Sequence, residues 1–203
     1  MKSKILLMLF FAISAVTNIP AAVESQKTND QEYIKQIEDY FNNIKTLKAD
    51  FVQVDKNGIE SFGKFWLKRP YSMKMDYIKP ATHVIIAKNN KVIHFDKELN
   101  EKTVTSMYSS PLSFFMESVI RMENAVKTLS TVDEQGILSI TFCKKDPDVD
   151  GAIKMVFQKN PFMLLKWEIF NSKKDLNLWN STQIILLNHE FGKKISDAEF
   201  TDP

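Results

Sequence analysis

The chain has 203 residues, of which 44% are hydrophobic and 26% charged, and its formal net charge is +2. This length suits one domain or two small ones, and a charge near zero excludes the basic field that nucleic-acid binding requires. A single cysteine excludes an internal disulfide and a cysteine-based zinc site. The feature left to explain is an apolar load of 15 phenylalanines, five tyrosines, three tryptophans and nine methionines.

Residues 1–22 have the pattern of a secretory signal peptide. Two lysines precede the apolar run 5–16, and the small residues Ala21 and Ala22 follow it. The run is shorter than the roughly 20 residues that a membrane-spanning helix needs. We expect cleavage after Ala21 or Ala22, which removes both lysines and leaves a domain of residues 23–203 with zero net charge. No cysteine near the cut is available to carry a lipid, so we expect a soluble protein located in the periplasm.

The first predicted element of this domain is an amphipathic helix, with Asn29 or Asp30 as its N-cap. Residues 23–29 are polar, and we expect them to be loosely structured. Apolar side chains then recur at spacings of three and four, which is the period of one helix face. They are Ile34, Ile37, Phe41, Ile44 and Leu47.

The hydrophobic period then changes to two, which predicts strands. Residues 51–54 and 62–69 are expected to form a hairpin around Asp55-Lys56-Asn57-Gly58, because Asn-Gly accepts the positive φ of a tight turn. In residues 71–77, bulky apolar residues alternate with polar ones, so one face of this strand is apolar. That apolar row is Tyr71, Met73, Met75 and Tyr77.

The remaining pattern completes a mainly β domain with helices. A hairpin is predicted around Asn89-Asn90, and Ser110-Pro111 is a typical helix start before the apolar segment 111–121. The other predicted strands are 82–88, 91–96, 101–107, 137–143, 153–158, 164–169, 177–187 and 198–201. We therefore predict a single α+β domain with one antiparallel sheet of about ten strands and two helices.

No residue pattern predicts catalysis, a metal or a cofactor. The segment Gly58–Lys64 resembles a phosphate loop, but Phe65 stands where a magnesium-binding hydroxyl is needed. The acidic turn 146–151 lacks the glutamate of a calcium loop. The three histidines stand apart in the sequence, and Cys143 ends an apolar strand, which is typical of a buried structural cysteine.

The apolar face of 71–77 has two interpretations. It is either ordinary core or one wall of a hydrophobic cavity covered by the 111–121 helix, and flexible methionines suit a site that adapts to acyl chains. Arg69 also has two interpretations. Because it ends its strand before Pro70, its guanidinium either reaches solvent or donates to open carbonyls at the end of a covering helix.

At this point a resemblance to a known family becomes visible. Four segments stand in the order found in the LolA family of periplasmic outer-membrane lipoprotein carriers, and the second of them has the pattern Gly-x-x-Trp-x-x-Arg-Pro. They are Phe51-Val52-Gln53, Gly63–Pro70, Tyr77 with Pro80, and Val92–Asp96. The apolar helix after Ser110-Pro111 falls where that family has lid helices. The chain departs from the family at Met73-Lys74, the usual place of an aromatic-arginine pair, and at Asn89-Asn90, where Asp-Gly is common.

The resemblance implies an unclosed antiparallel β-barrel of about ten or eleven strands with a helical lid over a hydrophobic cavity. It assigns Arg69 as the lid latch, through the backbone of the lid. We expect the lipid-binding cavity to be lined by Phe51, Phe65, Leu67, Met73, Met75, Tyr77, Phe115 and Met116.

The resemblance also implies a function and partners. The chain would be a monomeric periplasmic chaperone, without catalysis, that binds the acyl chains of lipoproteins. It would receive them from an inner-membrane ABC transporter complex of the LolCDE type and deliver them to an outer-membrane receptor of the LolB type. The alternatives are that receptor itself, which has the same fold, a periplasmic lipoprotein sensor, and a lipid-acting enzyme.

Overall fold

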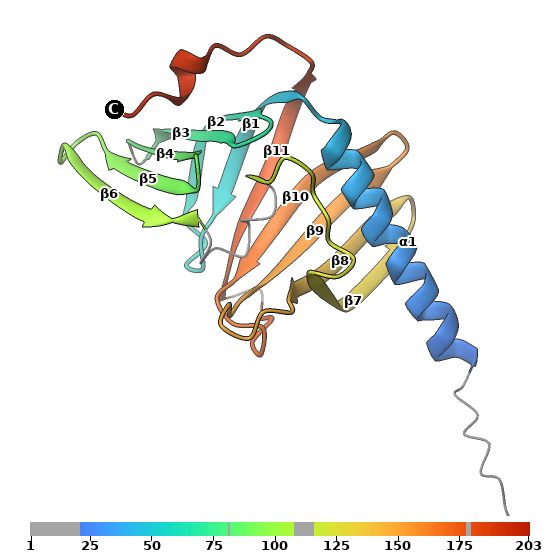
Figure 1. Cartoon of the computed structure of the whole chain (residues 1–203). Helices are drawn as coiled ribbons and strands as arrows, with labels where there is room; N and C mark the ends of the chain where they lie inside the picture. Colours follow the sequence, from blue (N-terminus) through green and yellow to red (C-terminus); the bar gives the residue numbers. More distant parts are fainter. Residues whose placement is uncertain (1–20, 81, 108–115, 178–179) are drawn as a thin grey trace, which may run out of the picture.

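The structure is a computed structural model that describes residues 21–80, 82–107, 116–177 and 180–203, with side chains from residue 29 onward. Its strands form one antiparallel sheet of eleven strands in the order β6-β5-β4-β3-β2-β1-β11-β10-β9-β8-β7 (Figure 1). The strands are β1 (Thr46–Val54), β2 (Glu60–Lys68), β3 (Ser72–Lys79), β4 (His83–Lys88), β5 (Lys91–Asp96), β6 (Glu101–Ser106), β7 (Val126–Glu134), β8 (Ile137–Lys144), β9 (Ala152–Lys159), β10 (Phe162–Phe170) and β11 (Ser181–Phe191).

The connectivity shows where the sheet stays open. The first strand pairs with the last, β1 with β11, so both lie at the centre of the sheet. The two outer edges are β6 and β7, which follow each other in the sequence. The connection between them, residues 107–125, therefore runs from one open edge to the other. The predicted single unclosed antiparallel sheet is confirmed.

One long helix, α1 (Ala21–Asn43), lies across the strands β8–β10 (Figure 1). Its buried residues Ile34, Ile37 and Phe41 join the main core, as the helical spacing predicts. Both helix ends differ from the prediction. The helix includes residues 23–29, which lack the apolar spacing that would have marked them as helical, and it ends at Asn43 because Leu47 pairs with Leu67 and Phe191 in β1.

Three further predictions need correction. Strand β7 was not expected, because this edge strand is largely exposed and lacks a regular apolar alternation. Residues 198–201 are not a strand. The chain there forms the short 3₁₀ helix η4 (Asp197–Phe200), whose first turn is capped by the Ser196 hydroxyl accepting from the amide of Ala198 at 3.3 Å. Residues 117–121 of the predicted second helix are not helical, and residues 111–115 lie outside the described residues.

The chain after β11 covers the outer face of the sheet opposite α1 (Figure 1). We call residues 192–203 the C-terminal strap. Its Ile195 and Phe200 are buried against Val84 and Ile86 of β4, with Trp66 and Ile93 packed alongside. Three ion pairs connect the strap to the sheet, and we call them the rim of the strap. They are Lys68–Asp197 at 2.6 Å, Lys74–Glu199 at 3.6 Å and Lys102–Asp202 at 2.7 Å.

Candidate functional site

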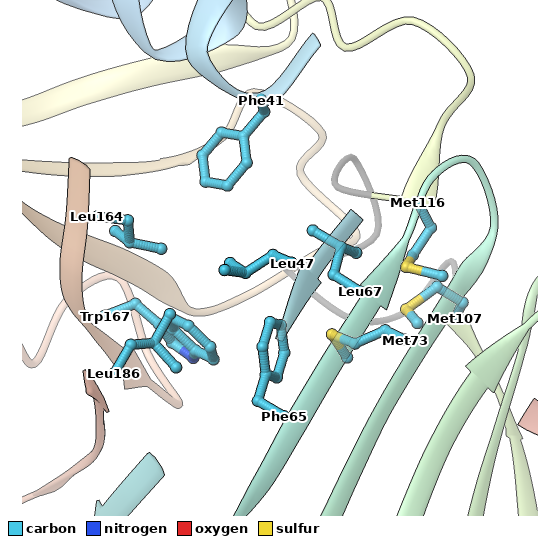
Figure 2. Close-up of a pocket in the computed structure, with 10 residues that line it drawn as sticks. All are labelled: Phe41, Leu47, Phe65, Leu67, Met73, Met107, Met116, Leu164, Trp167 and Leu186. Atoms are coloured by element: carbon cyan, nitrogen blue, oxygen red, sulfur yellow. The ribbon is translucent and has the colours of Figure 1, made fainter. Parts of the chain in front are cut away.

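An apolar cavity lies on the α1 side of the sheet (Figure 2). We call it the lid-side cavity, because Met116 of the 107–125 connection lines it beside the strands. Its volume is about 50 Å³, which holds only a few water molecules. Its lining contains no charged residue and comes from α1, five strands and the 107–125 connection: Phe41, Leu47, Phe65, Leu67, Met73, Met107, Met116, Leu164, Trp167 and Leu186.

A second cavity of about 200 Å³ adjoins it further along the same face of the sheet. We call it the inner cavity; it has a polar end at Gln53, Tyr77 and Thr182. The two cavities share Met73, Met107 and Trp167 as lining residues. Methionine is unbranched and changes rotamer readily, so movement of two side chains would join the cavities into one longer channel. The other lining residues are Met75, Ile85, Val92, Ile169 and Ile184.

The structure places most of the predicted lining residues in these two cavities. Phe65, Leu67, Met73 and Met116 line the lid-side cavity, and Met73, Met75 and Tyr77 line the inner cavity. Phe115 lies outside the described residues. Their part in binding a ligand stays a prediction.

Phe51 lines neither of these cavities. It is 1% exposed, and its ring meets the Tyr77 ring edge to face with centroids 4.9 Å apart. It lies directly over Gly63 on the neighbouring strand, where any Cβ would collide with the Phe51 ring and with the Asp76 carbonyl. Phe51 therefore belongs to the packed core that supports the cavity.

The prediction that Tyr71 belongs to the apolar row of residues 71–77 is wrong. Tyr71 is 41% exposed and lies before β3, in the turn after β2, with a positive φ of 71°. The strand begins at Ser72, so the inward row consists of Met73, Met75 and Tyr77.

Six residues that line the lid-side cavity were not predicted from the sequence: Phe41, Leu47, Met107, Leu164, Trp167 and Leu186. The apolar spacing predicted that Phe41, Leu47 and Leu186 are buried. Nothing in the sequence indicated that they face a cavity. Leu164 and Trp167 break strict alternation. The register of β10 against β9 shifts between Leu164 and Lys166, and this bulge turns both Leu164 and Trp167 toward the interior.

Arg69 lies at the rim of the lid-side cavity, directly after β2. Its Nη2 donates to the carbonyl oxygens of Glu117 and Ser118 at 2.8 and 3.2 Å, and to Asn42 Oδ1 at 3.4 Å. Its own amide donates to the carbonyl of Lys45 at 2.9 Å, which fixes the backbone from which the guanidinium extends. The arginine thus connects the sheet, the end of α1 and the 107–125 connection.

Two residues of α1 hold the next part of that connection. Asn42 Oδ1 accepts from the amide of Ile120 at 2.8 Å, and its Nδ2 donates to the carbonyl of the same residue at 3.0 Å. One helical turn earlier, Glu38 Oε1 accepts from the amides of Met122 and Glu123. We call residues 116–123 the crossing segment. Because 117–121 form no helix, side chains satisfy backbone groups there that intrahelical bonds would otherwise satisfy.

Burial perturbs the titratable groups beside the cavities. Burial lowers the pKa of the Arg69 guanidinium, a change that the nearby Glu117 carboxylate opposes, and arginine stays protonated in either case. Burial also raises the pKa of the Tyr77 phenol to about 12. That hydroxyl donates to Gln53 Oε1 at 2.6 Å. Burial and the neighbouring His94 lower the pKa of His83, whose ring stacks on Tyr77. All of these groups are therefore in their usual charge state near neutral pH.

Metal-binding clusters were sought across the described ranges. There, no group of three or more histidine, cysteine, aspartate or glutamate side chains is placed to hold a metal ion. The described part of the chain also has no helix long and apolar enough to cross a membrane. The chemistry available at the cavity is thus apolar contact, one cationic donor at the rim and a few neutral polar groups.

Comparison with known families decides what this arrangement represents. Residues 42–202 match the family model of the outer membrane lipoprotein carrier protein LolA. The chain belongs to the LolA family.

Curated relatives agree with membership of the LolA family at modest identity. An uncharacterized protein of Rickettsia prowazekii is 25% identical over 70% of this chain and 66% of its own length. An outer-membrane lipoprotein carrier protein of Methylococcus capsulatus is 29% identical over 50% of each chain, and one of Dechloromonas aromatica is 30% identical over 35% of this chain and 36% of its own. The matched region thus spans less than two thirds of each relative.

Solved structures with low identity share the fold of this LolA-family chain. A DUF1329 family protein from Desulfovibrio piger has a TM-score of 0.53 at 12% identity, covering 85% of this chain and 96% of its own. The MucA/MucB complex of Pseudomonas aeruginosa contains a chain with a TM-score of 0.50 at 8% identity, covering 86% of this chain and 61% of that one. These likenesses concern the fold alone.

Proposed function

We propose that this protein is a periplasmic carrier that binds the acyl chains of lipoproteins and releases them to an acceptor in the outer membrane. The observation that carries the proposal is a narrow apolar cavity beside which one arginine holds the segment that follows the lining residue Met116. The predicted signal peptide, residues 1–22, and the carrier names of the relatives support the export and the cargo. The donor would be an inner-membrane ABC transporter complex of the LolCDE type and the acceptor a receptor of the LolB type.

The cavity suggests how such a carrier loads. Each acyl methylene removed from water contributes about 0.8 kcal/mol, so binding of a long chain is strongly favourable. A cavity of about 50 Å³ does not hold a long acyl chain, so the cover has to move outward and the shared methionines have to rearrange before cargo enters. Loading thus requires an open state.

Arg69 then sets the balance between the closed and the open state. Opening breaks its hydrogen bonds to the carbonyls of Glu117 and Ser118 and exposes Met116. The closed state therefore competes with cargo and keeps the affinity below that of an acceptor that has no such latch. In this mechanism the arginine makes release possible.

The test is lipoprotein release from spheroplasts followed by transfer to outer-membrane receptor. The wild-type protein should release a palmitate-labelled lipoprotein as a soluble one-to-one complex and then transfer it. Arg69→Leu should still take up the lipoprotein but retain it about tenfold more tightly, since hydrogen bonds from a charged donor contribute about 1.5 kcal/mol. Gel filtration and label counting measure both steps.

Arg69→Lys is the matched control for this test. It keeps the positive charge but lacks the planar guanidinium that spans two carbonyl oxygens, so its transfer rate should lie between those of wild type and Arg69→Leu. Absence of any lipoprotein in the soluble fraction would contradict the carrier function. Unchanged transfer by Arg69→Leu would contradict only the latch.

A further inference from the structure

The indole of Trp167 is placed where the two cavities meet. Trp167 lies on β10, is 7% exposed and lines both the lid-side and the inner cavity. Its ring meets the Phe65 ring edge to face with centroids 5.7 Å apart, and Figure 2 shows it between Phe65 and Leu186. The side chain is thus held by packing in one position along the channel that joined cavities would form.

The Nε1–H of this indole has no acceptor within hydrogen-bond distance among the described residues. Of the residues that line the two cavities in the described ranges, only Trp167 has a buried polar atom without a partner. The Tyr77 hydroxyl of the same lining, by contrast, donates to Gln53 at 2.6 Å. An indole nitrogen is a donor only, so what Trp167 lacks is an acceptor.

A ligand that consists only of hydrocarbon leaves this donor unsatisfied. A buried donor without an acceptor is unfavourable by roughly 5- to 150-fold in an equilibrium constant, and native structures pair nearly all such groups. An acylated ligand carries the acceptor that is missing, because each of its chains begins at an ester or amide carbonyl. A carbonyl oxygen with hydrocarbon behind it therefore offers the acceptor that Trp167 lacks together with apolar contacts for the rest of the lining.

We propose that the Trp167 Nε1–H donates a hydrogen bond to an acyl carbonyl of the bound ligand and so makes the site selective for acyl esters and amides over alkyl chains without a carbonyl. This inference rests on the proposed function, because it concerns the same cavity and the same cargo. In this proposal Trp167 recognises the carbonyl group at the start of the acyl chain, and the rest of the lining contacts only the hydrocarbon.

The test compares two synthetic lipopeptides that differ only at the carbonyls. The first is a hydrophilic peptide with an S-(2,3-bis(palmitoyloxy)propyl)cysteine, and the second carries hexadecyl ethers in place of the palmitoyl esters. Competition against a fluorescent acyl probe should show the diester binding to the wild type about tenfold more tightly than the diether. Trp167→Phe should reduce this ratio to within about twofold of one.

Trp66→Phe is the matched control, because Trp66 lies among the residues that pack beneath the C-terminal strap and lines neither cavity. It should keep the wild-type ratio. Diester and diether phosphatidylglycerol form a second pair, which shows whether the recognised carbonyl belongs to lipoproteins or to phospholipids. If the wild type binds neither member of either pair, the proposed function fails. If it binds esters and ethers equally, the role of Trp167 fails while the carrier function stands.

A second measurement uses the wild-type protein alone. The indole N–H resonance of Trp167 in a ¹H–¹⁵N spectrum, assigned through its nuclear Overhauser contacts with the Phe65 ring, should move downfield when the diester lipopeptide binds. The diether should not produce that shift. A downfield shift of the same size with both ligands would overturn the hydrogen bond to the carbonyl.

Discussion

The crossing segment and the C-terminal strap cover opposite faces of the same sheet, and they are held in different ways. The strap buries Phe200 and Ile195, which are 1% and 4% exposed, directly against β4. The beginning of the crossing segment instead lies over a cavity and is held by Arg69, which donates to two backbone carbonyls.

The difference is one of physical mechanism. Apolar burial contributes in proportion to the area removed from water, so detaching the strap loses the whole of that contribution. A hydrogen bond to a backbone carbonyl is exchanged for one to water when it opens, so even the charged Arg69 donor contributes only about 1.5 kcal/mol. We therefore expect the C-terminal strap to stay bound to the sheet and the beginning of the crossing segment to move.

The two parts of the crossing segment differ in the same way. Its later part is fixed, because Ile120 and Met122 are 1% and 0% exposed and join the main core. Its beginning, up to the exposed Val119, is held by Arg69 and by the packing of Met116. We expect opening to start at 116–118 and to pivot near Ile120.

The largest effect is expected from removing the apolar anchor of the strap. Phe200→Ala should lower the free energy of unfolding by about 3 kcal/mol, because it removes a fully buried aromatic ring and leaves a cavity. Urea denaturation measures this change. Affinity for an acyl probe should stay as in the wild type, since the strap lies on the face away from the cavities.

The control for this prediction is Phe62→Ala, which truncates a phenylalanine that is 45% exposed. It should change the free energy of unfolding by less than about 1 kcal/mol. An equal loss in the two variants, or a loss of acyl binding in Phe200→Ala alone, would mean that the two covers are not independent.

A smaller effect is expected at the pivot of the crossing segment. Asn42→Ala removes the acceptor of the Ile120 amide and the donor to the Ile120 carbonyl, so the amide of Ile120 should exchange with solvent about tenfold faster. Hydrogen exchange followed by NMR measures this rate. Asn43→Ala, the next residue along α1, is the matched control and should leave it unchanged. Equal exchange in wild type and Asn42→Ala would contradict the pivot.

The sequence predicts the architecture well because most strands show an alternation of apolar and polar residues. The hairpin at Asn89-Asn90 is a clear case, since both residues have the positive φ, 50° and 64°, that the turn requires. Strand β7 could not be predicted in this way. Its apolar residues Val126, Leu129 and Val132 recur at every third position instead of alternating, which a largely exposed edge strand tolerates.

The candidate site was less predictable, for two physical reasons. The bulge in β10 shifts alternation, so nothing local in the sequence indicates that Trp167 and Leu164 face the same cavity. The contacts of Glu38 and Asn42 with the crossing segment join residues more than 75 positions apart, through backbone groups that any residue possesses. The proline after Arg69 placed that residue at the end of its strand, but only the family resemblance gave it the role of a latch, which stays a prediction.

The smallest effect concerns the rim of the strap, where ion pairs add to apolar packing. Hydrogen bonding to Lys68 holds the pKa of the exposed Asp197 carboxyl below its ordinary value of 3.8. A depressed carboxyl pKa stabilises the folded state above that ordinary value, and the contribution is lost as the pH falls through the lowered pKa. An NMR titration should find the Asp197 midpoint below 3.8 in the wild type and close to it in Lys68→Met. Lys64→Met, which removes the partner of Asp50 instead, should leave Asp197 unchanged. Because exposed ion pairs contribute little, acid should weaken the rim of the strap without releasing Phe200, and that would separate the two ways in which this cover is held.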